Sequence, residues 1–275
     1  RAAIEAYEAG AKTTLAVKGR FGWRGLRGSG ATSYSTNEFG YLPSPRVPVA
    51  NLDEEREVVY KRIIQCGLGL TDRRLARVMV EDGLEARKKL EEWGVILPRL
   101  GRHGVINGRV DPRIGLANVV RGSTNITVLE QTMVTDLLIQ DGICVGAIAI
   151  NEDDGEPLVL KTGATILATG GQAQLYRFNR HPSCVTGDGY AMGYNAGAEL
   201  MNMEFIYTNI GTAYPNCFNV YCGAWREHPS VRNVNGEEFR ERDTKPTKDR
   251  IITNASIITI LVRFMPIVVL AITHI

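Results

Sequence analysis

The sequence predicts an α/β protein in which helices pack on a doubly wound parallel sheet. Residues 1–10 are predicted to form a helix that ends at Gly10, and residues 13–17 a short buried strand directly after it. A helix that feeds a strand is the second half of a βαβ unit, so we expect a truncated N-terminus that lacks the first strand. An apolar strand at 164–168 then precedes a helix of small residues at 190–198, and such alternation is typical of this class.

Two helical pieces are predicted between residues 53 and 94. Acidic residues at 53–55 favour the first turn of one helix, because negative charge is stabilised at a helix N-terminus. Thr71 or Asp72 is expected to cap the next helix. The buried stripe of that second helix is predicted from apolar residues at helical spacing, namely Leu75, Val78, Met79 and Leu84.

From residue 125 the apolar pattern changes to a period of two, which indicates strands. Residues 126–134 are predicted to form one strand. Residues 144–150 and 158–160 flank an Asp-Asp-Gly turn at 153–155, and this arrangement predicts a β-hairpin. An antiparallel hairpin therefore lies between the two strands expected in the parallel sheet.

Composition and charge argue against several classes of protein. The 275 residues are 44% hydrophobic and 23% charged, which are ordinary values for a globular protein, so a disordered or collagen-like chain is not expected. The 32 basic and 30 acidic residues leave a net charge of +2, which gives no reason to expect nucleic acid as a partner. Five unevenly spaced cysteines favour a reducing, cytoplasmic location over a disulfide framework. Only Cys217 and Cys222 are close together, which is too little to predict a zinc site.

Two glycine-rich loops are the first candidates for ligand binding. One covers residues 18–33 after the first strand, and the other covers residues 168–171 after the apolar strand. Glycine lets a phosphate or a ring approach the backbone closely, because no Cβ intervenes. In a doubly wound sheet both loops lie at the carboxyl ends of strands, where ligands bind. Taken singly, either loop is equally compatible with an ordinary turn.

Three motifs in the second half of the chain resemble a known family. They are Ala168-Thr-Gly-Gly171, Thr186-Gly-Asp-Gly189 and Ala196-Gly-Ala-Glu-Leu-Met-Asn-Met-Glu-Phe205. In this order they are similar to the flavoprotein subunits of succinate dehydrogenase and fumarate reductase, and to L-aspartate oxidase. Segments at 5–10 and 28–32 agree with the same family.

The resemblance implies a Rossmann-like FAD-binding domain, incomplete at its first strand, followed by the start of an inserted α+β capping domain. We assign residues 1–206 to the FAD-binding domain, 207–250 to the start of the capping (substrate) domain and 251–275 to an apolar tail. Within the tail, residues 257–273 are nearly all apolar; this segment is at the short limit for a membrane span and is interrupted by Arg263 and Pro266. The alternatives are a buried helix or strand, or a tail produced by truncation or a changed reading frame.

The same resemblance implies which residues contact FAD. Lys18 and Gly19 would end a strand near the adenosine ribose, Val134 would offer its backbone to the adenine, and Asp188 would bind the flavin half. An ionised carboxylate suits hydroxyl groups because it only accepts hydrogen bonds. Asp188 is also expected as a cap of the following helix. The residues expected along the pyrophosphate and the flavin are Ser29, Gly30, Ala31, Thr32, Ser33, Ala168, Thr169, Gly170 and Gly171.

The sequence departs from the family pattern at four places. The Gly-x-Gly-x-x-Gly fingerprint that holds the pyrophosphate is missing, and Val17 stands where an acid usually contacts the ribose. No histidine lies in the loop around Gly30, where the family carries its flavin-linking histidine, so we predict non-covalent FAD. Asn209 stands where the substrate motif has a histidine, which affects the expected substrate specificity.

The resemblance implies a redox reaction on a small carboxylate substrate. A hydride would pass between the substrate and FAD, and an arginine of the capping domain would exchange the proton. Arg250, beyond the charged segment 237–243, is the nearest candidate, and a solvated surface arginine is its alternative. An iron–sulfur subunit is the implied electron-transfer partner, and it would bring the protein to the inner face of the membrane. The alternatives are an enzyme of the L-aspartate oxidase or adenylylsulfate reductase type, or a truncated, non-catalytic flavin-binding fragment.

Overall fold

The computed structural model describes residues 1–23, 30–31, 51–95, 112–177, 179, 181–203, 211–212, 218–219, 235–236 and 271–274. The chain divides into two compact units. The first unit comprises residues 1–48, 82–201 and 266–275, and the second comprises residues 49–81 and 202–265. The domain boundaries at 206 and 250 stay a prediction.

A four-stranded sheet forms the centre of the first unit. Its strands are β1 (Lys12–Ala16), β2 (Ile126–Leu129), β6 (Ala164–Thr165) and β9 (Ala271–His274), in the order β2-β1-β9-β6. β1 runs parallel to β2, whereas β9 runs antiparallel to both β1 and β6. Three of the four strands therefore point the same way. Together with the helices between them, they confirm the predicted α/β class.

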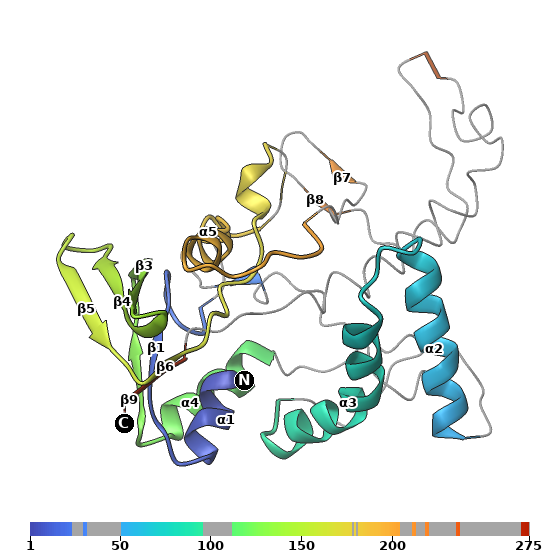
Figure 1. Ribbon diagram of the computed structural model, residues 1–275, viewed down its shortest axis with the longest axis horizontal. Coiled ribbons are helices and arrows are strands. Elements are labelled where there is room, and N and C mark those ends of the chain that lie inside the picture. The colour runs from blue at the N-terminus through green and yellow to red at the C-terminus, as the bar shows by residue number, and fades with distance from the viewer. Residues whose placement is uncertain are drawn as a thin grey trace. The chain divides into compact units, whose positions relative to one another are not determined.

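Two helices cover this sheet and complete its core (Figure 1). They are α1 (Ala2–Glu8), which leads directly into β1, and α4 (Pro112–Gly122), which leads into β2. Apolar side chains from both helices meet those of the strands, and burying them is the main favourable term in folding. The buried cluster comprises Ala3, Ile4, Leu15, Val120 and Ile126.

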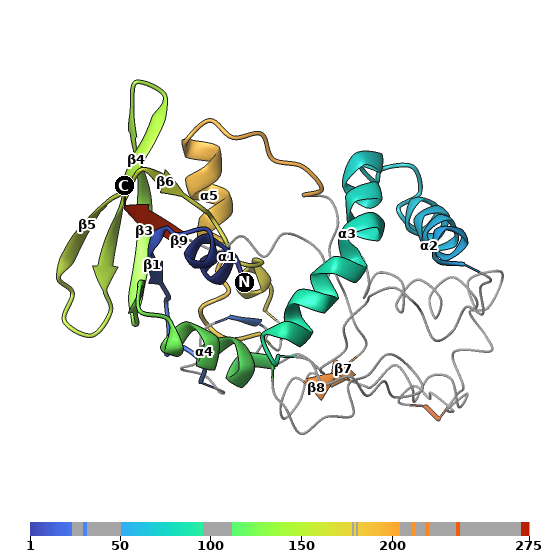
Figure 2. The same ribbon diagram turned by 90° about the horizontal axis from the view of Figure 1, so that it is seen from below.

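A separate antiparallel sheet follows in the order β3-β4-β5. Its strands are β3 (Thr132–Gln140), β4 (Ile143–Asn151) and β5 (Pro157–Lys161), so the predicted hairpin is confirmed. In both views this hairpin projects away from α1 and α4 (Figures 1 and 2).

Two strand predictions were wrong in their extent. The strand predicted at 126–134 is divided between β2 and β3, because Gln131 adopts a φ of +50° and turns the chain from one sheet into the other. The strand predicted at 164–168 is regular only over β6, the two residues that pair with β9. The remaining short elements are η2 (Ala173–Leu175), α5 (Asp188–Asn195), β7 (Gly211–Thr212) and β8 (Phe218–Asn219).

The helices predicted between residues 53 and 94 are confirmed as α2 (Leu52–Cys66) and α3 (Arg73–Glu92). Asn51 caps α2, and its side chain accepts a hydrogen bond from the Glu54 backbone N–H at 2.8 Å. Asp72 caps α3, because its Oδ1 accepts from the backbone N–H groups of Arg74 and Leu75. The structure thus selects Asp72 over Thr71.

The stripe predicted to bury α3 was wrong at Leu75 and Val78, whereas Met79 is partly buried. The side chains of Leu75 and Val78 are about half exposed, at 52% and 51%, whereas Ala76 and Val80 are buried. Arg77 lies beside this buried pair and reaches α2, where it forms an ion pair with Glu57 and stacks 3.8 Å from the Tyr60 ring centroid. The face of α3 that meets α2 is therefore rotated by one residue from the predicted stripe.

Glu8 links α1 to the end of α3 within the first unit. Its carboxylate accepts hydrogen bonds from Trp93 Nε1 at 2.7 Å and from Lys89 Nζ at 3.1 Å. These two hydrogen bonds and the Lys89 charge outweigh desolvation and lower the pKa of Glu8. Because the pKa of Glu8 is lower in the folded chain than in the unfolded chain, its ionised carboxylate stabilises the fold. This stabilisation is fully present above the unfolded pKa and is lost as pH falls through the folded pKa.

We expect Glu8→Gln to lower the melting temperature by about 1–2 °C at pH 7. The difference in melting temperature from the parent chain should shrink toward zero as pH falls below about 4, because the Glu8 carboxyl then becomes protonated in the folded as well as the unfolded chain. Thermal unfolding followed by circular dichroism at several pH values measures this. Glu85→Gln is the matched control, because its ion pair with Lys88 lies within one helix. An equal effect of the two substitutions would contradict a link between helices.

The apolar tail contributes one described strand, β9, which favours the strand alternative for residues 271–274. Within the ranges that the structure describes, no helix has the length and apolar character needed to cross a bilayer. Cys217 and Cys222 lie outside the described residues.

Candidate functional site

The end of β1 lies beside the segment in which β2 passes into β3. The Val17 backbone N–H donates to the Leu129 carbonyl at 2.9 Å, and the Val17 carbonyl accepts from Thr132 at 2.9 Å. The Gly19 carbonyl accepts from the Gln131 N–H at 3.3 Å. Lys18 and Gly19 are thus held at a strand end, as predicted. The strand that carries Val134 starts directly beside them.

Lys18 forms a closed triangle of polar contacts with the Thr186-Gly-Asp-Gly189 motif. Its Nζ lies 2.6 Å from Asp188 Oδ2 and 2.7 Å from Thr186 Oγ1. The Thr186 hydroxyl donates to the same Asp188 Oδ2 at 2.7 Å. The structure therefore joins two predicted site residues that are 170 positions apart in the sequence.

The ionised form of Asp188 is favoured in this triangle. Burial acts to raise the pKa of the carboxyl, but hydrogen bonds from Lys18 and Thr186 and the Lys18 charge outweigh it and hold the pKa below its usual value. Asp188 does not cap α5. Gly187 occupies the N-cap position, and no side chain caps the helix there. The capping role expected for Asp188 was wrong, because its carboxylate is turned toward Lys18.

Close packing between two motifs brings the second glycine-rich loop to the same place. A Cβ on Gly189 would lie 1.8 Å from Thr169 Oγ1, and one on Gly187 would lie 2.8 Å from the Gln172 Cβ. Both distances are shorter than real Cβ contacts. The segments 168–172 and 186–189 can therefore approach this closely only with glycine at these two positions.

Other glycines of the predicted site face open space. Gly30 and Gly170 have positive φ values of +81° and +76°, and no atom of the described residues lies within 4 Å of a Cβ built on either. Gly30 is placed near the motif by its backbone N–H, which lies 3.3 Å from Cys184 Sγ. The described side chains leave the Cβ position of both glycines empty, and such room beside the backbone suits the approach of a dinucleotide diphosphate. The residues present therefore fit the predicted FAD.

The structure brings together seven of the predicted site residues with defined contacts or open backbone: Lys18, Gly19, Gly30, Thr169, Gly170, Gly171 and Asp188. Ala31 adjoins Gly30 and Ala168 adjoins Thr169 within the described residues. Ser29, Thr32, Ser33, Asn209 and Arg250 lie outside the described residues. Sequence reasoning did not single out Thr186 or Cys184, although both belong to the segment that carries the Thr-Gly-Asp-Gly motif.

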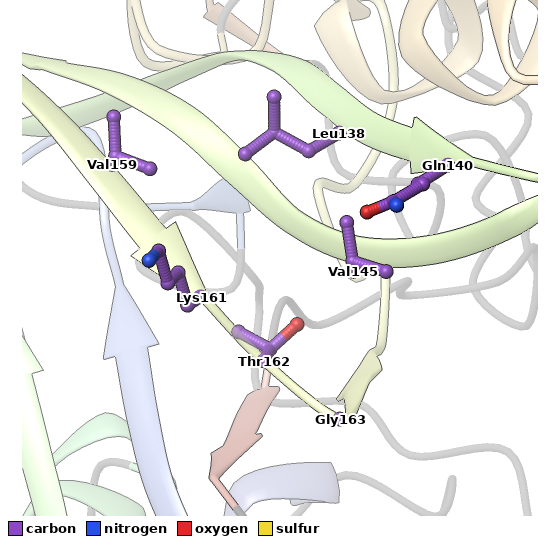
Figure 3. A pocket seen from close by; sticks show the side chains of 7 residues that line it. All are labelled: Leu138, Gln140, Val145, Val159, Lys161, Thr162 and Gly163. Atoms are coloured by element: carbon purple, nitrogen blue, oxygen red, sulfur yellow. The ribbon is translucent and has the colours of Figure 1, made fainter.

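A shallow depression lies elsewhere, on the antiparallel sheet (Figure 3). It is mostly apolar, and Lys161 and Gln140 supply its charged and amide groups. No predicted site residue lines it. Its lining residues are Leu138, Gln140, Val145, Val159, Lys161, Thr162 and Gly163.

Comparison with known proteins agrees with the FAD-binding geometry. Residues 1–218 match the FAD binding domain. The chain belongs to this family. It is 29% identical over 223 residues to an uncharacterised FAD-dependent oxidoreductase of Methanocaldococcus jannaschii, covering 75% of this chain and 39% of that protein. It is 26% identical over 182 residues to a fumarate reductase (CoM/CoB) polypeptide of Methanothermobacter marburgensis, covering 59% and 33%.

Solved structures show the same fold. The Sdh1 protein of Mycobacterium smegmatis in complex with UQ1 superposes with a TM-score of 0.73 at 22% identity, covering 92% of this chain and 46% of that one. The chain thus spans less than half the length of these relatives. Family and fold together confirm the predicted Rossmann-like FAD-binding domain, and FAD is the cofactor of this domain.

Proposed function

We propose that the chain is the FAD-binding part of an FAD-dependent oxidoreductase of the succinate dehydrogenase and fumarate reductase type. The observation that carries the proposal is the junction of Lys18, Thr186 and Asp188, together with glycines whose Cβ positions are empty among the described residues. Membership of the FAD binding domain family and the similarity to a fumarate reductase polypeptide support it.

Each part of the site has a separate task in this proposal. Gly30 and Gly170 offer backbone to the FAD diphosphate, and the Asp188 carboxylate accepts from cofactor hydroxyl groups. FAD is bound non-covalently and supplies the redox chemistry when bound. The substrate is a small carboxylate held by the capping domain at 207–250, where Arg250 exchanges the proton. An iron–sulfur subunit receives or supplies the electrons.

The first experiment is an absorbance spectrum of the purified chain, followed by FAD titration and acid precipitation. We expect a flavin band, saturable uptake of added FAD, and release of the flavin into the acid supernatant. Flavin that stays in the pellet would overturn the non-covalent assignment. A folded chain that takes up no FAD even in large excess would overturn the proposed function.

The FAD-loaded chain also tests the assigned reaction. After the flavin is reduced by dithionite, fumarate should reoxidise it, and the return of the flavin band measures the rate. Arg250→Gln should abolish this reoxidation while FAD uptake stays within about twofold of the parent. If Arg250→Gln reoxidises normally, the proton-exchanging residue is another one.

A further inference from the structure

We propose that Lys18 is a positioning residue for FAD binding, which holds the Asp188 carboxylate through Oδ2 so that Oδ1 is directed to cofactor hydroxyl groups. The inference rests on the proposed function and adds to it a residue that acts through another. Sequence reasoning placed Lys18 and Asp188 on different halves of FAD, whereas the structure places them in direct contact.

The contacts of Asp188 are one-sided. Among the described residues, both hydrogen bonds that it receives end on Oδ2, one from the Lys18 ammonium and one from the Thr186 hydroxyl. A carboxylate has about four acceptor positions on its two oxygens, so Oδ1 keeps its capacity to accept. Because two donors fix Oδ2, the side chain is held in one orientation before any cofactor arrives.

Lys18 is itself held well enough to act as this support. The backbone on either side is tied to β2 and β3 through Val17 and Gly19, and the Lys18 side chain is only 21% exposed. Its ammonium also donates to Thr186, so the lysine has two partners rather than one. An ordered pair of this kind loses less side-chain entropy on binding than one that must first be assembled.

The alternative role for Lys18 is a direct contact with the diphosphate. In the structure Asp188 already matches the Lys18 charge, and two of the three N–H donors of Lys18 go to Asp188 and Thr186. A direct contact with the diphosphate would use the third donor, and loss of that contact would not depend on the protonation of Asp188. Among the described residues, Lys18 is the charged group in contact with Asp188, and its other partner, Thr186, does not titrate. Loss of Lys18 should therefore raise the Asp188 pKa, so that the carboxyl takes up a proton at a higher pH than in the parent chain.

The test is FAD affinity from pH 8 to pH 5, measured by flavin fluorescence on the full chain. The parent should bind with nearly constant affinity. Lys18→Met should bind about tenfold more weakly at pH 8, and the deficit should grow toward pH 5 as the protonated fraction of Asp188 increases. Lys18→Arg should restore affinity to within about threefold, since a guanidinium also donates to a carboxylate. Lys12→Met, an exposed lysine at the other end of β1, is the matched control.

Two results would contradict the positioning role of Lys18. A pH-independent deficit in Lys18→Met, or no restoration by Lys18→Arg, would overturn the positioning role, because a phosphate contact or a structural tie gives no such trend. If Lys18→Met does not fold, Thr186→Val takes its place as the test variant. We expect a smaller loss of FAD affinity with the same dependence on pH, and a loss that does not change with pH would overturn the inference. If the parent chain takes up no FAD, the proposed function fails instead.

Discussion

Replacing Gly189 with alanine is expected to lower the free energy of unfolding by about 1–3 kcal/mol, the usual cost of adding a methyl group to a closely packed site. The new Cβ would lie 1.8 Å from Thr169 Oγ1 and 2.8 Å from Thr169 Cβ. The Thr169 Cβ is fixed to the backbone, so a rotamer change cannot relieve the contact. The segments 168–172 and 186–189 must then separate, and FAD affinity should fall with stability. Denaturant unfolding and FAD titration measure the two effects.

Gly193→Ala is the matched control for this substitution. Gly193 lies on the same helix, α5, and its nearest neighbours would be in ordinary contact with a Cβ, at 3.8 Å and 3.9 Å. Alanine there should be neutral or should stabilise the chain by up to about 1 kcal/mol, because glycine is unfavourable inside a helix. If both variants lost the same stability, the effect would come from α5 in general and not from its contact with Thr169.

Strands β1 and β2 could be predicted from sequence because their signals are local, whereas the antiparallel strand β9 between β1 and β6 was not part of the predicted parallel sheet. The apolar period distinguishes helix from strand, and Gly19 follows soon after the end of β1. The break after β2 carries no such signal, because the residue with positive φ is Gln131 rather than glycine or asparagine. The sequence pattern therefore predicted a single strand across β2 and the start of β3, although the two strands belong to different sheets.

The same limit applies to side chains that meet across long sequence separations. Spacing alone suggested Leu75 and Val78 for the buried face of α3, but the Arg77 contacts with Glu57 and Tyr60 of α2 decide which face is covered. Likewise, Lys18 and Asp188 could each be placed by motif resemblance, but their ion pair depends on the packing of 168–172 against 186–189. The packing of these two segments cannot be predicted from a local sequence pattern.

Gly170→Ala tests whether the open glycine loop binds the cofactor. Alanine at a φ of +76° is strained, so stability should fall by about 1 kcal/mol, but a Cβ there meets no atom of the described residues within 4 Å. If FAD approaches this backbone as proposed, the methyl group occupies the space that the diphosphate needs. FAD affinity should then fall by about tenfold to a hundredfold, as several backbone hydrogen bonds are lost or lengthened.

A matched control separates backbone strain from cofactor contact in this prediction. Gly155, in the turn between β4 and β5, has a φ of +77° and also has no atom within 4 Å of a built Cβ. Gly155→Ala therefore imposes the same strain at a place where no cofactor contact is proposed, and it should lose similar stability but bind FAD like the parent chain. Parallel titrations of the two variants decide the matter. Equal FAD affinity in both would mean that the loop at 168–171 is a structural turn, and the diphosphate would have to be bound by other residues.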